Sequence, residues 1–278
     1  MAKSVNDLTA CNTHLIMLLS HSEILKILPK YRNNLKFFHL NAQSLARKRT
    51  QLKNLFNDIG ENTIFGISET WLSPENDVKL WNILSETHIL FRNDRKQTKK
   101  QKGGGVALYV PKRLSPREMK NLNLFDENNF ESLWIECKKN YQSKSNDKML
   151  INITYCPQKN LHNQFLDELA LNLDNAISVC NSVYLMGDYN INYLDRFERN
   201  NLDSVIIPYG LNVCSSETPT RITQSSETHI DYIIGEDTSK NIVFESNFKS
   251  DHLSSLLITQ TKITKKKPRK FVTFDKKK

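Results

Sequence analysis

Short apolar segments alternate with segments of helical periodicity along most of the chain. Two segments, 45–59 and 164–180, repeat apolar residues at three- and four-residue spacing, which predicts amphipathic helices. The runs with the length and composition of buried strands are 35–40, 63–68, 106–110, 132–137, 149–155, 182–187, 229–234, 241–245 and 255–259. This alternation predicts a layered α/β or α+β domain with two sheets or one large mixed sheet.

The pattern divides the chain into three parts. Residues 1–34 are poorly patterned except for an amphipathic helix that ends at Pro29, and we interpret them as an N-terminal extension. Residues 35–259 hold the strand and helix signals and form the predicted domain. Residues 260–278 form a basic tail or the remnant of a linker.

Composition excludes several classes of protein. The chain of 278 residues is 38% hydrophobic and contains 13 Phe, 9 Tyr and 3 Trp, so most of it should fold. No apolar run approaches the roughly 20 residues of a membrane span, and none forms a signal-peptide core. The five cysteines are scattered and contain no C-x-x-C pair, which excludes a zinc finger and a disulfide framework. We expect a nuclear or cytoplasmic protein with no membrane partner and no obligate protein partner.

The positive charge is concentrated in two places. Residues 260–278 hold nine basic residues against one acidic residue, whereas the rest of the chain carries 30 basic against 29 acidic residues. A second basic block spans 92–102, beside three consecutive glycines. Both regions are interpreted as solvated segments or as contacts to phosphates, and the KKKPRK run as an alternative nuclear-import address.

Polar residues of a restricted kind follow, precede or lie within the apolar runs. Carboxylate and amide oxygens suit Mg²⁺ or Mn²⁺, and a neighbouring Asp–His pair forms an acid/base couple. A metal, an acid/base histidine and amides that hold anions together indicate phosphoryl chemistry. The residues concerned are Asn41, Glu69, Tyr155, Asp188, Asn190, Asp231, Asp251 and His252.

Seven short motifs occur in a characteristic order and spacing. They are LNAQSL (40–45), SETWL (68–72), YCP (155–157), GDYN (187–190), TPTRIT (218–223), HIDYII (229–234) and SDH (250–252). Over residues 35–259 the chain resembles the endonuclease/exonuclease/phosphatase superfamily, and more narrowly the apurinic-endonuclease-like domains of non-LTR (LINE-type) retrotransposons. The resemblance implies a deoxyribonuclease I-like, four-layer sandwich in which two packed mixed sheets are flanked by helices.

The resemblance also implies a metal site. Glu69 would be the principal ligand of Mg²⁺, with Mn²⁺ as the alternative ion, and Asn41 would hold the metal or a phosphate beside it. Asp251 would serve as an alternative ligand. Members of the superfamily often have an acid two residues after the first Asn, but this position is Gln43 here. A second metal ligand is therefore expected to be weaker or missing.

Catalytic roles follow from the same resemblance. Asp188 would activate or orient the attacking water, and Asn190 would hold a phosphate oxygen. His252, with its ring fixed by Asp231, would contact the scissile phosphate and stabilise the transition state. Tyr155 would bond a phosphate oxygen or assist the leaving group. The identity of the general base stays open at this point.

Substrate contacts are assigned to three further residues. Thr218 and Arg221 belong to the TPTRIT segment, and Lys102 belongs to the basic block beside the glycines. Trp71 is interpreted as a core aromatic, with a shelf beside the substrate as the alternative.

The implied function is a Mg²⁺-dependent endonuclease that nicks DNA and leaves 5′-phosphate and 3′-hydroxyl ends. The chain has too few residues after 259 for a reverse transcriptase, so we expect a retrotransposon-derived protein without one. Two alternatives stay open. One is a catalytically idle nucleic-acid-binding remnant, and the other is a phosphomonoesterase or lipid phosphodiesterase of the same superfamily.

Overall fold

The fold is seen in a computed structural model of the chain. The structure describes residues 19–73, 75, 81–95, 103–139, 147–214, 218–236 and 240–263. No helix in these ranges combines the length and apolar character needed to cross a membrane.

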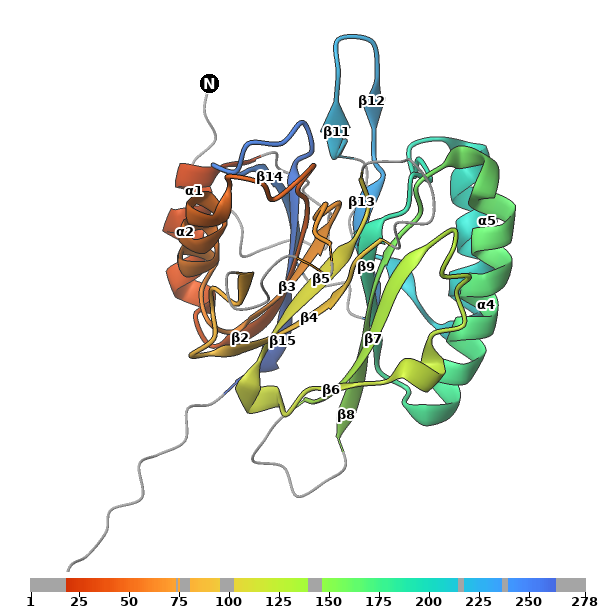
Figure 1. The fold of residues 1–278 in the computed structure, drawn as a ribbon, viewed down its shortest axis with the longest axis horizontal. Coiled ribbons are helices and arrows are strands. Elements are labelled where there is room, and N and C mark those ends of the chain that lie inside the picture. The colour runs from red at the N-terminus through yellow and green to blue at the C-terminus, as the bar shows by residue number, and fades with distance from the viewer. Residues whose placement is uncertain are drawn as a thin grey trace, which may run out of the picture.

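Two mixed sheets form the centre of the fold (Figure 1). The larger sheet contains, in spatial order, β1 (Leu19–Ser20), β14 (Asn241–Glu245), β15 (Ser254–Lys262), β2 (Asn34–Asn41), β3 (Thr63–Ser68), β5 (Val106–Pro111) and β4 (His88–Asn93). The smaller sheet contains β10 (Asn212–Val213), β13 (Asp231–Gly235), β9 (Val183–Asp188), β8 (Lys148–Tyr155), β7 (Glu131–Lys138) and β6 (Arg117–Glu118). A separate hairpin of β11 (Arg221–Ile222) and β12 (Glu227–Thr228) projects from one end of the molecule.

Helices cover the outer face of each sheet. Helices α1 (His21–Ile27) and α2 (Arg49–Ile59) lie on the larger sheet, and α4 (His162–Val179) and α5 (Arg196–Ile206) lie on the smaller one (Figure 1). Short 3₁₀ turns occur at η2 (Leu28–Tyr31), η3 (Lys112–Leu114), η4 (Lys120–Leu122), η5 (Lys159–Leu161) and η6 (Ile207–Tyr209). The helix–sheet–sheet–helix order is the deoxyribonuclease I-like four-layer sandwich, which confirms the predicted fold class.

Two crossover units determine where polar side chains gather. Strands β2 and β3 pair in parallel through α2, and β8 and β9 pair in parallel through α4. Because paired parallel strands end at the same edge, Asn41 lies opposite Ser68 and Tyr155 lies opposite Asp188 in their registers. The antiparallel neighbour β13 begins beside the end of β9. The two sheets therefore bring five strand termini to one end of the sandwich.

The core has three layers of apolar side chains, one between the sheets and one beneath each pair of helices. Between the sheets, the rings of Phe37 and Tyr184 stack with their centroids 4.2 Å apart. Gly66 of β3 faces Met186 of β9, and a Cβ atom at position 66 would lie 2.2 Å from the Met186 sulfur. The sheets approach closely here because position 66 carries no side chain.

The structure differs from the sequence-based elements in several places, including the short strands β1, β6, β10, β11 and β12, which were not predicted. The helix predicted over 45–59 begins at Arg49, because the preceding loop includes Arg47 at a φ of 61°. Strand β4 and helix α5 were not predicted. Only Leu202 and Ile206 of α5 are buried, so its apolar periodicity is weak, and it is initiated by the Asp195 side chain, which accepts from two backbone amides. Residues 1–18 of the predicted extension lie outside the described residues.

Candidate active site

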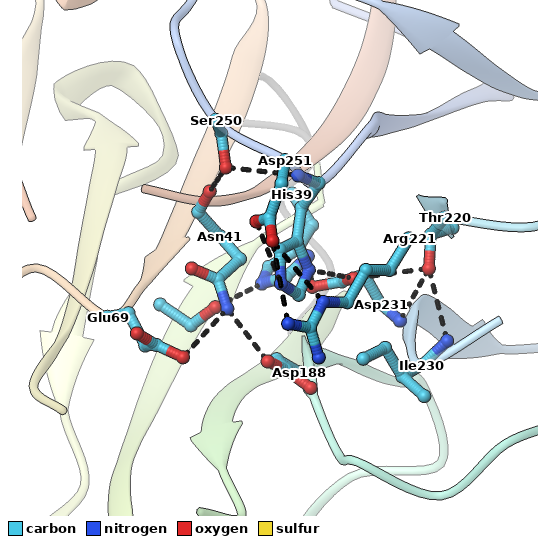
Figure 2. Close-up of polar contacts among 12 residues, drawn as sticks. His39, Asn41, Glu69, Asp188, Thr220, Arg221, Ile230, Asp231, Ser250 and Asp251 are labelled. Carbon is cyan, nitrogen blue, oxygen red and sulfur yellow. Dashed lines mark hydrogen bonds and ion pairs between the residues drawn. The ribbon is translucent and has the colours of Figure 1, made fainter. Parts of the chain in front are cut away.

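A buried polar cluster lies where the strand termini of the two sheets meet (Figure 2). The larger sheet supplies Asn41, at the end of β2, and Glu69, directly after β3. The smaller sheet supplies Tyr155, Asp188 and Asp231 from β8, β9 and β13. Residues far apart in sequence are thus held on five adjoining strands, a rigid base for a reactive site.

Asn41 joins the two sheets through its amide. Its Nδ2 donates to Glu69 Oε1 at 3.1 Å and to Asp188 Oδ2 at 2.7 Å (Figure 2). The Tyr155 hydroxyl donates to the same Glu69 oxygen at 3.0 Å. Burial, together with the charges of Glu69 and Asp188, raises the pKa of Tyr155, so this hydroxyl keeps its proton and acts as a donor. The network fixes two carboxylates and a phenol around one position.

Asp188 is almost completely buried among other acids. Burial, followed by the charge of Asp231, raises the pKa of Asp188 well above the usual range of a carboxyl group, and Glu69 adds to this effect. The backbone amide of Asn190 donates to Asp188 Oδ1 at 3.0 Å. The Asn190 side chain donates to the Cys156 carbonyl at 2.7 Å, in a turn where its own φ is 50°. Asn190 is thus held beside Asp188.

His252 and Asp231 form a tight pair. His252 Nδ1 lies 2.6 Å from Asp231 Oδ2, and both side chains are nearly inaccessible to solvent. Burial alone would lower the pKa of His252, but the charge and hydrogen bond of Asp231, with the charges of Asp188 and Asp251, raise it to about 9. The imidazole is therefore charged at neutral pH, and Asp231 fixes the orientation of its ring.

Two side chains that support Asp231 were missed by the sequence analysis. The Thr220 hydroxyl donates to Asp231 Oδ2 at 3.1 Å. The buried His39 has its Nδ1 3.9 Å from Asp231 Oδ1, and burial lowers the pKa of this imidazole to about 4. A signal existed for both: Thr220 lies in the TPTRIT motif, and His39 precedes Asn41 by two residues and so shares its strand face.

The rim of the cluster carries an exposed ion pair. Asp251 Oδ2 lies 3.4 Å from Arg221 Nε, and Asp251 Oδ1 lies 3.5 Å from His252 Nε2. Arg221 also forms an isolated antiparallel β-bridge with His252. The side chains of Arg221 and Asp251 are each two-fifths exposed. The structure therefore places Asp251 on the solvent side of His252, whereas Glu69 and Asn41 lie together deeper in the site.

The donor set fits a divalent cation. Ligand atoms of Asp188, Asp231 and His252 all lie within 4.8 Å of one another. Asp231 Oδ1 is buried and has no hydrogen-bond partner within the described part of the chain. Because His252 Nδ1 is already bonded to Asp231, the donors that remain are mainly oxygens, which suit Mg²⁺ or Mn²⁺. A cation would also offset the repulsion between the crowded carboxylates.

Trp71 does not belong to the core, so the prediction of a core aromatic is wrong. Its side chain is 44% exposed, and its indole N–H donates to Glu69 Oε2 at 3.2 Å. The chain leaves β3 with Glu69 at a φ of 51° and Trp71 at a φ of 55°. This turn directs the ring away from the interior while the indole nitrogen stays on the cluster.

The remaining predicted contacts lie apart from the cluster or outside the described residues. Thr218 is nearly buried, and its carbonyl accepts a hydrogen bond from His229. Lys102 lies outside the described residues. In the basic block, Arg92 pairs with Asp94 and Arg95 pairs with Glu131, so both described arginines are engaged within the fold. The interpretation of this whole block as a solvated loop does not hold for these two.

Comparisons with known proteins agree with this geometry. The sequence profile of the Endonuclease/Exonuclease/phosphatase family matches residues 34–252. No curated protein sequence matches the chain significantly. Among solved structures, the catalytic domain of Xenopus laevis APE2 superposes with a TM-score of 0.60 at 15% identity, covering 84% of this chain and 94% of that chain.

Two further structures show the same fold. A 3′ phosphatase from Neisseria, NExo, bound to a product DNA hairpin, has a TM-score of 0.58 at 13% identity, covering 81% of this chain and 99% of that chain. The endonuclease domain of TRAS1, a telomere-specific non-LTR retrotransposon, has a TM-score of 0.56 at 13% identity, covering 82% of this chain and 99% of that chain. At these identities the likeness shows the fold alone.

Proposed function

Because the chain belongs to the Endonuclease/Exonuclease/phosphatase family, we propose that it is a divalent-metal-dependent endonuclease that nicks DNA. The observation that carries the proposal is the joint presence of a charged His252–Asp231 pair and a Glu69–Asn41–Asp188 network at one buried position. A cationic imidazole facing a cluster of metal-binding oxygens matches the charge of a phosphodiester and its transition state. A retrotransposon origin is part of the proposal and is supported by the order and spacing of the motifs.

The cation would be held by Glu69 and by the amide oxygen of Asn41, and it would neutralise charge that develops on the phosphate. The side chains of the chain itself position the other reactants. His252, charged and held by Asp231, donates to a non-bridging phosphate oxygen. Asp188 accepts a hydrogen bond from the attacking water and orients it. Since His252 already carries its proton, it is suited to contact the anion and not to accept a proton from water.

The bond changes define the products. The water oxygen forms a bond to phosphorus on the side opposite the leaving 3′-oxygen, and the bond between phosphorus and the 3′-oxygen breaks. One proton leaves the water, and one proton joins the departing oxygen. The Tyr155 hydroxyl, which donates to Glu69 in this structure, lies in reach of the site to donate to phosphate oxygens. The products are a 5′-phosphate and a 3′-hydroxyl.

The test is nicking of supercoiled plasmid by the full chain. We expect relaxed circles with Mg²⁺, none with EDTA, and at least about 100-fold slower nicking by His252→Ala. Glu245→Gln, which removes an exposed acid of β14 outside the cluster, is the matched control and should nick as the wild type does. Extension of the nick by a DNA polymerase without prior end repair would establish the 3′-hydroxyl.

Two results would overturn the proposal. A folded wild-type protein that binds DNA but never nicks it would support the idle remnant. A protein that releases inorganic phosphate from 3′-phosphorylated DNA but leaves intact plasmid untouched would be a phosphomonoesterase, the activity in the name of the Neisseria structure.

A further inference from the structure

The exposed ring of Trp71 stands directly beside the cluster. Of the three tryptophans in the sequence, Trp81 and Trp134 are 5% and 1% exposed, whereas Trp71 is 44% exposed. Leaving an indole in water forgoes the free energy that its burial would supply. A large exposed aromatic side chain next to a candidate active site is therefore a binding surface to be explained.

The backbone around Trp71 holds the ring in this exposed position. Its amide donates to the Gly104 carbonyl at 2.9 Å, and its indole N–H donates to Glu69 Oε2 at 3.2 Å. Glu69 and Trp71 both have φ values in the left-handed region, which non-glycine residues rarely adopt. A Cβ atom at Gly103 would lie 3.5 Å from the indole nitrogen, so the glycine segment passes close to the ring. The ring is thus fixed at one edge, and 44% of the surface of Trp71 remains accessible beside the described residues.

We infer that Trp71 is the stacking platform for one nucleobase of the DNA strand that is cut, next to the scissile phosphate. This inference rests on the proposed function, because it takes the substrate of the cluster to be DNA. A base is the matching group, since every nucleobase presents a flat aromatic face and stacking on an indole needs no particular sequence. The hydrogen bond between Trp71 and Glu69 places the platform directly beside the carboxylate that would hold the cation at the phosphate.

The position of the platform accounts for affinity that charge does not supply. Without residues 260–278, the chain carries 30 basic against 29 acidic residues, and the described arginines Arg92 and Arg95 are paired with acids. The net charge of this part is then only +1, so its overall electrostatic attraction to DNA is weak. Stacking on Trp71 adds contact energy that does not depend on counterion release.

Two substitutions separate stacking from the hydrogen bond to Glu69. Trp71→Phe and Trp71→Ala both remove the indole N–H, and only the first keeps an aromatic ring. Binding is measured by fluorescence anisotropy of a labelled duplex oligonucleotide in EDTA, which prevents cleavage. The same variants are tested on oligonucleotides that carry a baseless tetrahydrofuran spacer at each position flanking the cut. Leu171→Ala, which removes a half-exposed side chain of α4, is the control.

The expected result is coupling at a single flanking position. Trp71→Ala should bind the normal oligonucleotide roughly 5- to 100-fold more weakly than Trp71→Phe does. With the spacer at the stacked position the two variants should bind within about twofold of each other, because the base that the ring would contact is gone. Addition of DNA should also quench the tryptophan emission of the wild type and leave that of Trp71→Phe unchanged.

The outcomes separate this inference from the proposed function. Nicking by the wild type with equal affinity of the Phe and Ala variants at every position would overturn the stacking platform alone. Coupling at one position without nicking would support the platform and overturn the endonuclease. Absence of any DNA binding by the folded full chain would overturn both.

Discussion

Asp188 and Asp231 lie opposite each other in the antiparallel register of β9 and β13. The pairing sets two buried carboxylates side by side at the end of the smaller sheet, where repulsion between them is weakly screened. His252 supplies one positive charge to this pair. The arrangement therefore leaves excess negative charge, which makes the site costly for folding and favourable for a divalent cation.

Replacing Asp188 with Asn should raise stability and remove activity together. A carboxyl group whose pKa is raised by folding contributes stability below its unfolded pKa of about 4, and that contribution is lost as the pH rises. The wild type loses this contribution progressively as the pH rises toward 8, whereas Asn carries no charge. We expect the free energy of unfolding of Asp188→Asn at pH 8, measured by urea titration, to be about 1–2 kcal/mol higher than that of the wild type. Its nicking should be at least about 100-fold slower. Equal free energies of unfolding of the two proteins at pH 8 would show that the charge of Asp188 does not destabilise the fold.

The activity should fall on the alkaline side as His252 loses its proton. Burial alone would lower the pKa of His252, but the charge and hydrogen bond of Asp231 raise it to about 9. The charged form therefore persists through neutral pH. Nicking rates should decline as the pH passes about 9. Asp231→Asn removes the charge that sustains the imidazolium, so its alkaline decline should begin at lower pH. A pH–rate profile with saturating Mg²⁺ measures both, and an unchanged alkaline decline in the variant would show that another group titrates.

The same raised pKa has a consequence for stability. Because folding raises the pKa of His252 above its unfolded value of about 6.5, its contribution to stability is complete below that pH and is lost as the pH rises through about 9. Asp188 acts in the same direction. The free energy of unfolding of the metal-free protein should therefore decrease from pH 6 to pH 9.

Divalent cations should stabilise the folded chain in the absence of substrate. A cation that binds only the folded state at 100 times its Kd adds about 2.7 kcal/mol. We expect Mg²⁺ or Mn²⁺ to raise the melting temperature, and to raise it more at pH 8 than at pH 6, because the raised pKa of Asp188 lets protons compete with the cation at the lower pH. Differential scanning fluorimetry measures the shift. Glu69→Gln should lose most of it and Glu245→Gln should keep it, and an equal shift in both would place the cation elsewhere.

A methyl group at Gly66 should disturb the packing between the sheets. The new Cβ atom would lie 2.2 Å from Met186 Sδ and 3.1 Å from Ile153 Cδ1. We expect Gly66→Ala to lower the free energy of unfolding by about 1–3 kcal/mol in urea titrations. The Met186→Ala substitution makes room for the methyl group. The double variant should therefore lose less free energy of unfolding than the sum of the losses of the two single variants. Strict additivity would show that the contact is relieved in another way.

The sequence predicted most strands because apolar runs such as 63–68 coincide with β3, whose six residues are all buried. It also identified polar residues that gather in the structure, since each lies at or beside an end of a strand. The pairing of Asp188 with Asp231 was not predictable in this way, because it depends on the register between strands more than 40 positions apart. Trp71 was misjudged since composition identifies an aromatic residue but not the left-handed turn that exposes it.

The position of strand β15 determines when the larger sheet can be completed during translation. It follows His252 in the chain and inserts between β14 and β2, so the larger sheet joins one of its latest strands to one of its earliest. During translation, β2 has an open edge until β15 has been made and can pair with it. A nascent chain therefore carries no complete candidate site, and the larger sheet is continuous only when β15 has paired with β2 and β14.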